Sequence, residues 1–333
     1  MSNTTIYDVA GAAKVSLATV SRVLNNPEKV KQETRDRVLR VINELGYRPN
    51  AIARGLASRK TTTVGVIVSD ITRASVAQML SGIIDIANKY RYSIKLFAIT
   101  ESSKALDVAM NVVAEQVDGA LYLNDELESK YAEEILDKIQ ENQIPVTLCN
   151  VVYDKEQLPS VSIDYEHASY EVTKKLIKEG RKDIYLLSTT RKYAVNDRKE
   201  SGYLKAMKEA NLEPHIFRTS GDTYINRPHF KDFLAHNKVD GVIAVRDSIA
   251  VSFMNVAREE FGKKIPKDVS IVGFQNTKYA ILASPALTSI DIPVYDIGAA
   301  SMQLLTKLMN NETVDDKNLL LPHRIIERQT TEN

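Results

Sequence analysis

The residue types that catalyse reactions or bind metals are few in this chain of 333 residues, and their spacing fits neither purpose. The histidines show no metal-ligand spacing with carboxylates or with Cys149, the single cysteine. The sequence has no phosphate-binding loop, no Gly-x-Gly-x-x-Gly segment and no nucleophile elbow. We therefore expect a protein that is not an enzyme and that holds no metal and no cofactor.

The first 47 residues instead carry a pattern suited to DNA binding. Ser16 is placed to cap a helix over about residues 17–25. The inward-facing residues at helical spacing would be Val20, Val23 and Leu24. The outer face would hold Ser16, Ala18, Thr19 and Arg22. Arg22 is the best-suited base reader, because a guanidinium can bind guanine O6 and N7 with two hydrogen bonds.

Helices are expected on both sides of this segment. Thr5 can cap a first helix, with Asp8 three residues further on. A third helix would cover about residues 32–45, with Leu45 facing inward, and stop at Gly46. Two short helices joined by a tight turn indicate a helix-turn-helix, although a three-helix module without a ligand has the same periodicity.

Residues 48–58 (RPNAIARGLAS) open with a proline at a helix-start position and consist mainly of small residues. A helix this short is marginal in isolation. We expect the segment to fold against DNA and to insert Leu56 between base steps in the minor groove. A flexible linker is the alternative, against which Ile52 and Leu56 argue.

The charge distribution agrees with a polyanionic partner for the first segment. Residues 1–60 hold 11 basic and 5 acidic side chains, whereas the remainder holds 33 basic and 38 acidic. The single cysteine fits a reducing compartment, and neither an apolar signal segment nor an apolar run of about 18 residues occurs. We therefore expect a cytoplasmic protein without a membrane segment.

Three segments of the head and hinge resemble the lactose/galactose-repressor family: residues 5–10 (TIYDVA), 15–25 (VSLATVSRVLN) and 45–56 (LGYRPNAIARGL). The resemblance implies major-groove contacts from the second helix and minor-groove contacts from the hinge, with Leu56 as the wedge. The residues expected to bind DNA are Thr5, Tyr7, Ser16, Leu17, Ala18, Thr19, Arg22, Asn25, Asn50, Ala53, Arg54, Leu56 and Ala57. Leu17 departs from relatives that often have Met or Tyr there, which leaves the preference at one base pair open.

Beyond residue 62, strand-like apolar runs alternate with amphipathic helical stretches, which predicts parallel sheets covered by helices on both faces. Two echoes indicate two such units: QVDGAL at 116–121 matches KVDGVI at 238–243, and Ile-Pro occurs at 144–145 and 265–266. Coincidence of common turn residues is the alternative. We expect an all-α helix-turn-helix head plus an α/β core of two doubly wound parallel-sheet lobes, like that of periplasmic sugar-binding proteins.

The resemblance extends over the whole chain and implies four parts. Residues 1–48 would form the DNA-binding domain, and residues 49–61 the hinge helix and linker. Residues 62–161 with 291–322 would form the N-lobe, and residues 162–290 with 323–333 the C-lobe. The cleft between the lobes, at the carboxyl ends of the strands, would be a natural ligand site.

Sugar-responsive relatives hold a polar set of side chains in that cleft. Arg198 and Asp247 match the set, whereas Arg246 and Gln275 depart from it. Replacing an anionic acceptor by Gln275 loses charge-assisted hydrogen bonds, each worth roughly 1.5–3 kcal/mol. A filled or degraded sugar pocket is the favoured interpretation, although Gln can still bind hydroxyls.

The part of the family that 53–66 (ARGLASRKTTTVGV) most resembles uses a protein corepressor, the serine-phosphorylated histidine-containing phosphocarrier protein. The resemblance implies a docking surface of Asp85, Tyr90, Tyr92, Tyr295, Asp296, Gln303, Lys307 and Arg324. Tyr90 and Tyr92 are expected to be exposed, since tyrosine is a rigid interface anchor. Family members carry Arg at position 303, and Gln303 cannot form the two-pronged contact of Arg with phosphate.

Three functions remain in competition at this point. The first is a homodimeric regulator of carbon catabolite genes that binds a pseudo-palindromic operator. The second is an operon repressor that responds to a sugar or a small sugar phosphate in the cleft. A sugar-binding transport protein is the third, and the DNA-binding pattern and the missing signal segment argue against it.

Overall fold

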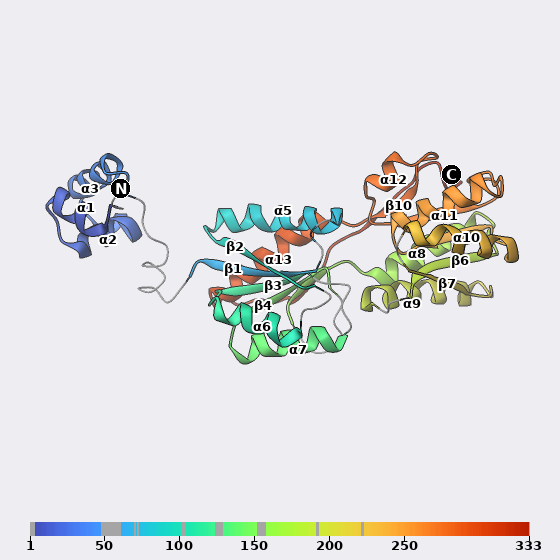
Figure 1. Cartoon of the computed structure of the whole chain (residues 1–333), viewed down its shortest axis with the longest axis horizontal. Coiled ribbons are helices and arrows are strands. Elements are labelled where there is room, and N and C mark those ends of the chain that lie inside the picture. The colour runs from blue at the N-terminus through green and yellow to red at the C-terminus, as the bar shows by residue number, and fades with distance from the viewer. Residues whose placement is uncertain are drawn as a thin grey trace. The chain divides into compact units, whose positions relative to one another are not determined.

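The computed structural model describes residues 4–47, 61–69, 71, 73–100, 104–123, 129–151, 158–190, 193–220 and 223–332. It divides into two compact units, Met1–Thr62 and Thr63–Asn333. We call the first unit the head and the second the core (Figure 1).

The head is a small helical bundle made of α1 (Ile6–Ala13), α2 (Leu17–Asn25), a 3₁₀ turn η1 (Pro27–Lys29) and α3 (Gln32–Glu44). Its centre consists of small and β-branched side chains from all three helices, namely Val9, Ala10, Ala13, Val20, Val23, Val38 and Val41. The predicted inner face of α2 is confirmed, because Val20 and Val23 are buried and Leu24 packs against this centre.

The start of α1 and the end of α3 are determined by the residues at those positions. The predicted cap of α1 is confirmed: the Asp8 amide donates to Thr5 Oγ1 at 3.4 Å, and the Thr5 amide donates to Asp8 Oδ2 at 2.8 Å. After α3 the chain turns at Gly46, whose φ of 61° is a conformation that glycine adopts at little cost. The expectation that Leu45 faces inward is wrong, since it caps the helix and is 39% exposed.

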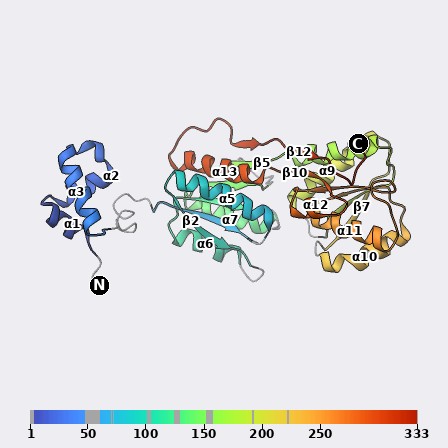
Figure 2. The same cartoon turned by 90° about the horizontal axis from the view of Figure 1, so that it is seen from above.

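The first sheet of the core has the strand order β11-β5-β4-β3-β1-β2, and all its strands are parallel. The strands are β1 (Thr63–Val68), β2 (Ser93–Ala98), β3 (Gly119–Leu123), β4 (Val146–Cys149), β5 (Ser160–Ser162) and β11 (Asn318–Leu320). The covering helices are α5 (Ala74–Lys89), α6 (Ala105–Ala114), α7 (Ser129–Glu141) and α13 (Val294–Met309). Helices α5 and α13 pack together on one face, and α6 and α7 on the other (Figures 1 and 2).

The second sheet has the order β12-β10-β9-β8-β6-β7, with β12 antiparallel to β10 and the other pairs parallel. The strands are β6 (Ile184–Thr189), β7 (His215–Thr219), β8 (Gly241–Ala244), β9 (Ser270–Phe274), β10 (Thr288–Asp291) and β12 (Arg324–Ile326). Its helices are α8 (Tyr165–Lys178), α9 (Ala194–Glu209), α10 (Thr223–His236), α11 (Asp247–Glu259) and α12 (Lys278–Leu282). Helix α8 packs on α9, and α10 on α11 (Figure 1).

The two sheets repeat one plan, as the sequence echoes predict. The segments 116–121 and 238–243 lead into β3 and β8, which occupy the same place in the two strand orders. The two Ile-Pro pairs precede β4 and β9, which also correspond. The predicted α/β core of two doubly wound lobes is therefore confirmed.

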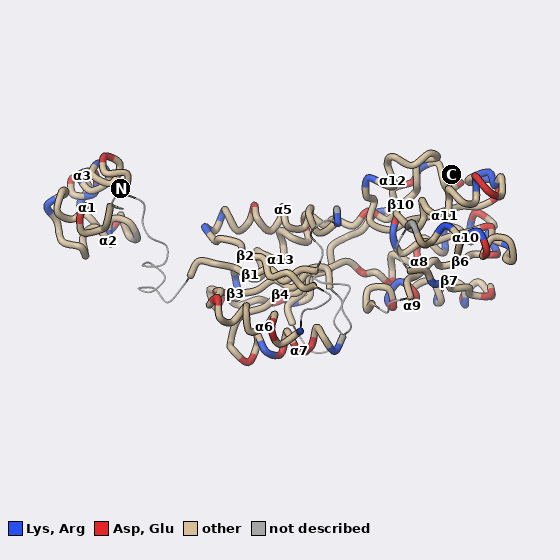
Figure 3. Tube along the Cα trace, viewed as in Figure 1, with Lys and Arg blue, Asp and Glu red and all other residues tan. Residues whose placement is uncertain are grey.

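Charged residues lie mainly on helices and loops, while the central strands are almost free of them (Figure 3).

Each half of the core is completed by a helix from elsewhere in the chain. Helix α8 follows β5 of the first sheet yet packs on α9, and α13 follows β10 of the second sheet yet packs on α5. Both helix pairs meet through a glycine. A Cβ on Gly82 of α5 would overlap the Tyr295 carbonyl oxygen, and one on Gly202 of α9 would overlap that of Glu166. The expected lobe boundaries within these crossovers stay a prediction.

Candidate nucleic-acid interface and effector sites

The second helix of the head presents the side chains expected to read bases. Its cap is Ser16, whose Oγ accepts the Thr19 amide at 3.2 Å and lies 2.9 Å from Thr19 Oγ1. Ala18 and Arg22 are exposed on the opposite side of α2 from buried Val20 and Val23, and Leu17 is exposed at the start of the helix. The short helix therefore offers a guanidinium and a small side chain on its outer face, with an apolar side chain and a pair of hydroxyls at its first turn.

The start of α1 holds two further residues that are expected to bind DNA, Thr5 and Tyr7. Tyr7 is 69% exposed, which is unusual for a tyrosine and leaves its hydroxyl accessible. Thr5 has its hydroxyl 2.8 Å from Asp8 Oδ2, and hydrogen bonds from the Thr5 amide and hydroxyl lower the pKa of Asp8. Asn25 is the last residue of α2. The five hinge residues expected to bind DNA lie outside the described residues: Asn50, Ala53, Arg54, Leu56 and Ala57.

The face formed by α5 and α13 brings together two residues of the expected corepressor surface that are 210 positions apart. Tyr295 donates its hydroxyl proton to Asp85 Oδ2 at 2.7 Å. This hydrogen bond, followed by burial and the nearby charges of Asp85 and Asp296, raises the pKa of Tyr295. The bond depends on Gly82, because only a residue without a side chain lets α5 approach the backbone of α13 at Tyr295.

The other expected corepressor residues are spread around this pair. Asp296, Gln303 and Lys307 are exposed on α13, and Gln303 lies one turn before Lys307 on the same side. Tyr295 and Lys307 are twelve residues apart on that helix, or about 18 Å along its axis. Arg324 is exposed on β12 of the second sheet, opposite Asp291.

Tyr90 and Tyr92, at the end of α5, differ from one another. Tyr90 is exposed, with the Lys89 ammonium 5.9 Å from its ring centroid. The expectation that Tyr92 is also exposed is wrong. Its ring packs against the core, and burial, with a smaller contribution from Asp118, raises the pKa of its hydroxyl. The turn between the two tyrosines reverses at Arg91, which has a φ of 63°, so they face different surroundings.

Asp247, expected in the ligand cleft, is buried and hydrogen-bonded within the protein. It is the first residue of α11 and 1% exposed. Its Oδ2 accepts the amide and hydroxyl of Thr277 at 2.6 and 2.8 Å, and its Oδ1 accepts the Ser289 hydroxyl at 2.6 Å. Burial raises the pKa of Asp247 to about 6, against the opposing effect of these three hydrogen bonds. The carboxylate is therefore poorly placed to receive a sugar hydroxyl.

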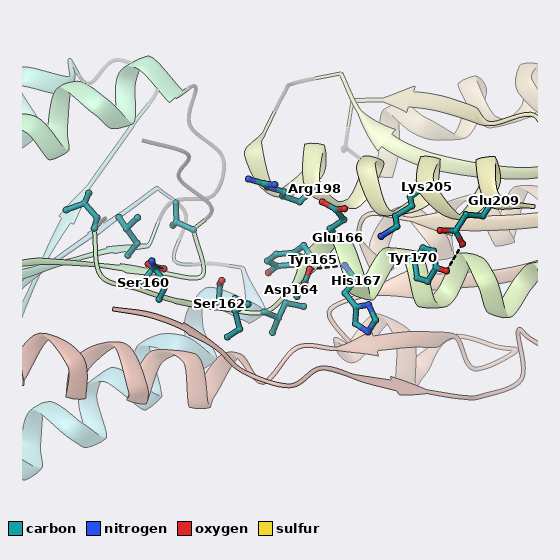
Figure 4. A pocket seen from close by; sticks show the side chains of 16 residues that line it. Ser160, Ser162, Asp164, Tyr165, Glu166, His167, Tyr170, Arg198, Lys205 and Glu209 are labelled. Carbon is teal, nitrogen blue, oxygen red and sulfur yellow. Dashed lines mark hydrogen bonds between the residues drawn. The ribbon is translucent and has the colours of Figure 1, made fainter. Parts of the chain in front are cut away.

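A pocket of about 800 Å³ has one residue of the expected cleft set in its lining (Figure 4). Arg198 lines it, whereas Arg246, Asp247 and Gln275 are not among its lining residues. Apolar side chains such as Leu148 and Leu158 form the wall from the first sheet. The opposite wall comes from α8 and α9, where Tyr170 donates to Glu209 Oε2 at 2.7 Å (Figure 4).

Gln275, the other departure from the sugar-binding pattern, sits in an unusual backbone conformation. It directly follows β9 and has a φ of 100°, which few residues other than glycine adopt. Such conformations concentrate at functional sites and tight turns. The neighbouring Asn276 is engaged within the second lobe, because its amide group donates to Asp291 Oδ1 at 2.9 Å.

Lys199 is a buried charge that the sequence analysis did not single out. Its ammonium donates to the Val245 carbonyl at 3.1 Å and lies 4.7 Å from the Phe274 ring centroid and 5.1 Å from that of Tyr165. Position 199 lies between Val195 and Tyr203 on the buried side of α9. The sequence signal for this buried charge is a lysine four residues from an apolar residue on either side, at helical spacing. Its ammonium, held at the ends of β8 and β9, occupies space at the edge of the second sheet where ligands of such folds bind.

Among the described residues, no three His, Cys, Asp or Glu side chains gather closely enough to hold a metal ion. Nor does any helix of these residues have both the length and the apolar character to cross a membrane.

Family comparisons agree with both units. Residues 5–50 match the model described as bacterial regulatory proteins, lacI family, and residues 173–331 match a periplasmic binding protein-like domain. The catabolite control protein A of Priestia megaterium is 41% identical over 99% of both chains. The chain belongs to the lacI family of bacterial regulatory proteins. It is a DNA-binding transcription regulator, and its relatives are regulators rather than enzymes.

Other transcription regulators are also similar to this chain in sequence or in fold. The HTH-type transcriptional regulator pepR1 of Lactobacillus delbrueckii subsp. lactis is 39% identical over 99% of this chain and 98% of its own. A crystal structure of the transcription regulator CcpA of Lactococcus lactis is 31% identical, with a TM-score of 0.71, over 81% of this chain and 99% of its own. The Lac repressor dimer bound to operator and an anti-inducer shares the fold at 24% identity, with a TM-score of 0.88 over 99% of both chains.

Proposed function

We propose that this chain regulates carbon catabolite genes in the cytoplasm by binding a pseudo-palindromic operator as a homodimer. The observation that carries the proposal is the outer face of α2, where Ala18 and Arg22 are exposed, with Leu17 at the start of the helix, on the second helix of a lacI-family head. The full-length similarity to a catabolite control protein A supports the class of target genes.

In the proposed complex, α2 lies in the major groove and Arg22 binds a guanine in each half of the operator. The hinge folds against the DNA. Asn50, Ala53, Arg54 and Ala57 then follow the minor groove, while Leu56 separates two base pairs at the operator centre. The basic surplus of residues 1–60 supports this contact with phosphates.

Apolar surface on the core supports the homodimer. The short helix α12 exposes Tyr279, Ile281 and Leu282, and Leu282 is 79% accessible. Contiguous exposed apolar side chains mark interaction sites in soluble proteins. A dimer that buries them would also present two heads to the two halves of an operator.

The proposed corepressor is the serine-phosphorylated histidine-containing phosphocarrier protein, bound on the α5–α13 face. The bonded Asp85–Tyr295 pair supports such a site, because it holds an exposed aromatic side chain in one position. Gln303 offers an amide where a guanidinium would give the phosphate two charged hydrogen bonds. We therefore expect weaker coupling than an arginine would give, within the 5–150-fold range that 1–3 kcal/mol of coupling supplies.

A sugar-responsive repressor is the second candidate, and the pocket lined by Arg198 favours it. A sugar or a small sugar phosphate bound there would contact side chains of the first sheet and of helices α8 and α9. Against this candidate, Asp247 and Lys199 are bonded internally.

One titration separates the two candidates. Operator binding is measured for the full chain alone, with the serine-phosphorylated carrier, with the unphosphorylated carrier and with sugars. Enhancement by the phosphorylated carrier that is lost in Tyr295→Ala, kept in Arg198→Ala and increased in Gln303→Arg supports the corepressor. Leu204→Ala, which trims another exposed side chain on α9, is the control. A response to a sugar alone that disappears in Arg198→Ala and persists in Tyr295→Ala would establish the second candidate instead.

A further inference from the structure

Lys199 is a charged side chain that α9 carries into the interior of the core, where it is 3% exposed. Its ammonium donates to the carbonyl of Val245, which directly follows β8, at 3.1 Å. The ring of Phe274, the last residue of β9, has its centroid 4.7 Å from the same nitrogen. A carbonyl oxygen and an aromatic ring therefore hold the ammonium at the carboxyl edge of the second sheet.

Tyr165 joins this group to the first sheet. It is the buried first residue of α8, and its ring centroid lies 5.1 Å from the Lys199 ammonium. Its hydroxyl donates to Asn150 Oδ1 at 2.8 Å. Asn150 directly follows β4, and its own backbone amide donates to the Val161 carbonyl of β5 at 2.8 Å. A continuous set of buried contacts thus runs from the end of β4 to the ends of β8 and β9.

These polar groups are costly to bury unless their partners stay in place. An ammonium taken out of water needs a carbonyl or an aromatic face to replace its hydration, and a buried phenol hydroxyl needs an acceptor. The acceptor of Tyr165 belongs to the first sheet, whereas the acceptor of Lys199 belongs to the second. The contacts therefore favour one relative placement of the two sheets.

In two-lobed binding folds, a ligand between the carboxyl edges of the sheets contacts both lobes and holds them together. We propose that Asn150, Tyr165 and Lys199 do this from within the chain, as an internal substitute for a bound small molecule. We call these three residues the interlobe link. With this link the core needs no small molecule to keep one arrangement of its lobes. The inference concerns the core alone, so it holds or fails independently of the proposed operator binding.

The test measures the distance between the lobes in the full chain without DNA. Spin labels are attached at Glu134→Cys on α7 and Asp232→Cys on α10, which are exposed positions, while Cys149 is buried. Dilution with unlabelled chain ensures that double electron–electron resonance reads distances within one chain. The link is broken by Lys199→Met, which removes the charge from a side chain of similar length, or by Tyr165→Phe, which removes one hydroxyl.

The labelled parent should give one narrow distance without any added sugar. Lys199→Met and Tyr165→Phe should each lose it to a broad distribution. The double variant should be no broader than either single variant, since each change breaks the same link. Two matched controls should keep the parental distance: Lys208→Met, at an exposed lysine of α9, and Tyr185→Phe, at a tyrosine of β6. Circular dichroism checks that every variant is folded.

Three results would overturn the proposal. If both single variants keep the parental distance, the contacts only fill space. If only one of them broadens it, the residues do not act as one link. A parent that is itself broad and narrows only with a sugar would show that the lobes do require a ligand. Should Lys199→Met fail to fold, Tyr165→Phe decides alone, because it removes a single oxygen atom and keeps the ring.

Discussion

Asp247 should make the stability of the core depend on pH between about 4 and 7. Its pKa is raised from 3.8 to about 6, mainly because burial removes the carboxylate from water. The difference of about 2 pKa units corresponds to about 3 kcal/mol, at 1.36 kcal/mol per unit. Below pH 4 the group is protonated in both folded and unfolded chains, and the contribution is fully present. As the pH rises through 6, it is lost, because the unfolded chain ionises more readily.

Urea unfolding of the parent and of Asp247→Asn, followed by circular dichroism from pH 4.5 to 7.5, measures this effect. Asn cannot accept the three hydrogen bonds from Thr277 and Ser289, so the variant should be less stable at low pH. The gap between the two proteins should then narrow by about 2 kcal/mol by pH 7, since only the parent loses stability through this group. Asp296→Asn, which removes an exposed carboxylate, is the control.

A gap that stays constant across this pH range would refute the reasoning. It would mean that the Asp247 carboxylate is hydrated in the folded protein, as in an open ligand cleft. In that case the internally bonded arrangement would no longer count against the sugar-responsive candidate.

Other variants test the head, the hinge and the helix contact. Arg22→Ala should cost about 1–3 kcal/mol on the operator and relax the preference at one base pair per half-site, so an unchanged base-substitution profile would contradict the assignment. Leu56→Ala should weaken operator binding and leave binding to random DNA unchanged, as measured by titration with both duplexes. Gly82→Ala should cost about 1–3 kcal/mol in thermal unfolding, because the added Cβ overlaps the Tyr295 carbonyl. Gly11→Ala, where a Cβ meets nothing, is its control and should cost no stability.

The head and the central strands could be predicted from sequence because their signals are local. The Thr5–Asp8 box and the spacing of Val20 and Val23 lie within a few residues of the structure that they produce. Strand β1 is readable from the sequence because nearly all its side chains are buried, which makes it a continuous apolar run.

Elements with mixed surroundings were harder to predict. Strand β7 is an edge strand that is only partly buried, so its sequence lacks a clear apolar pattern. Helix α9 lacks a continuous apolar stripe, because three of its buried residues are polar: Asn196, Lys199 and Glu200. Their burial is possible only with partners elsewhere in the fold, such as Arg218 on β7 for Glu200.

Whether the expected cleft residues are free to bind a ligand could not be predicted for a related reason. The partners that bond Asp247 lie 30 and 42 residues further along the chain. No local pattern reports such contacts, so a family match at Asp247 suggests a ligand group where the structure has a bonded carboxylate. Tyr92 is a similar case, since its burial depends on the turn at Arg91.

The exchange of α8 and α13 between the two halves of the core has a consequence for protein synthesis. The first sheet needs β11, which ends at Leu320, and the second needs β12, which ends at Ile326. Neither half can therefore complete its sheet on the ribosome until almost the entire polypeptide has emerged. Truncation just before β11, at about residue 317, should consequently damage both lobes together. A ribosome that stalls there would hold a finished DNA-binding head on an unfinished core.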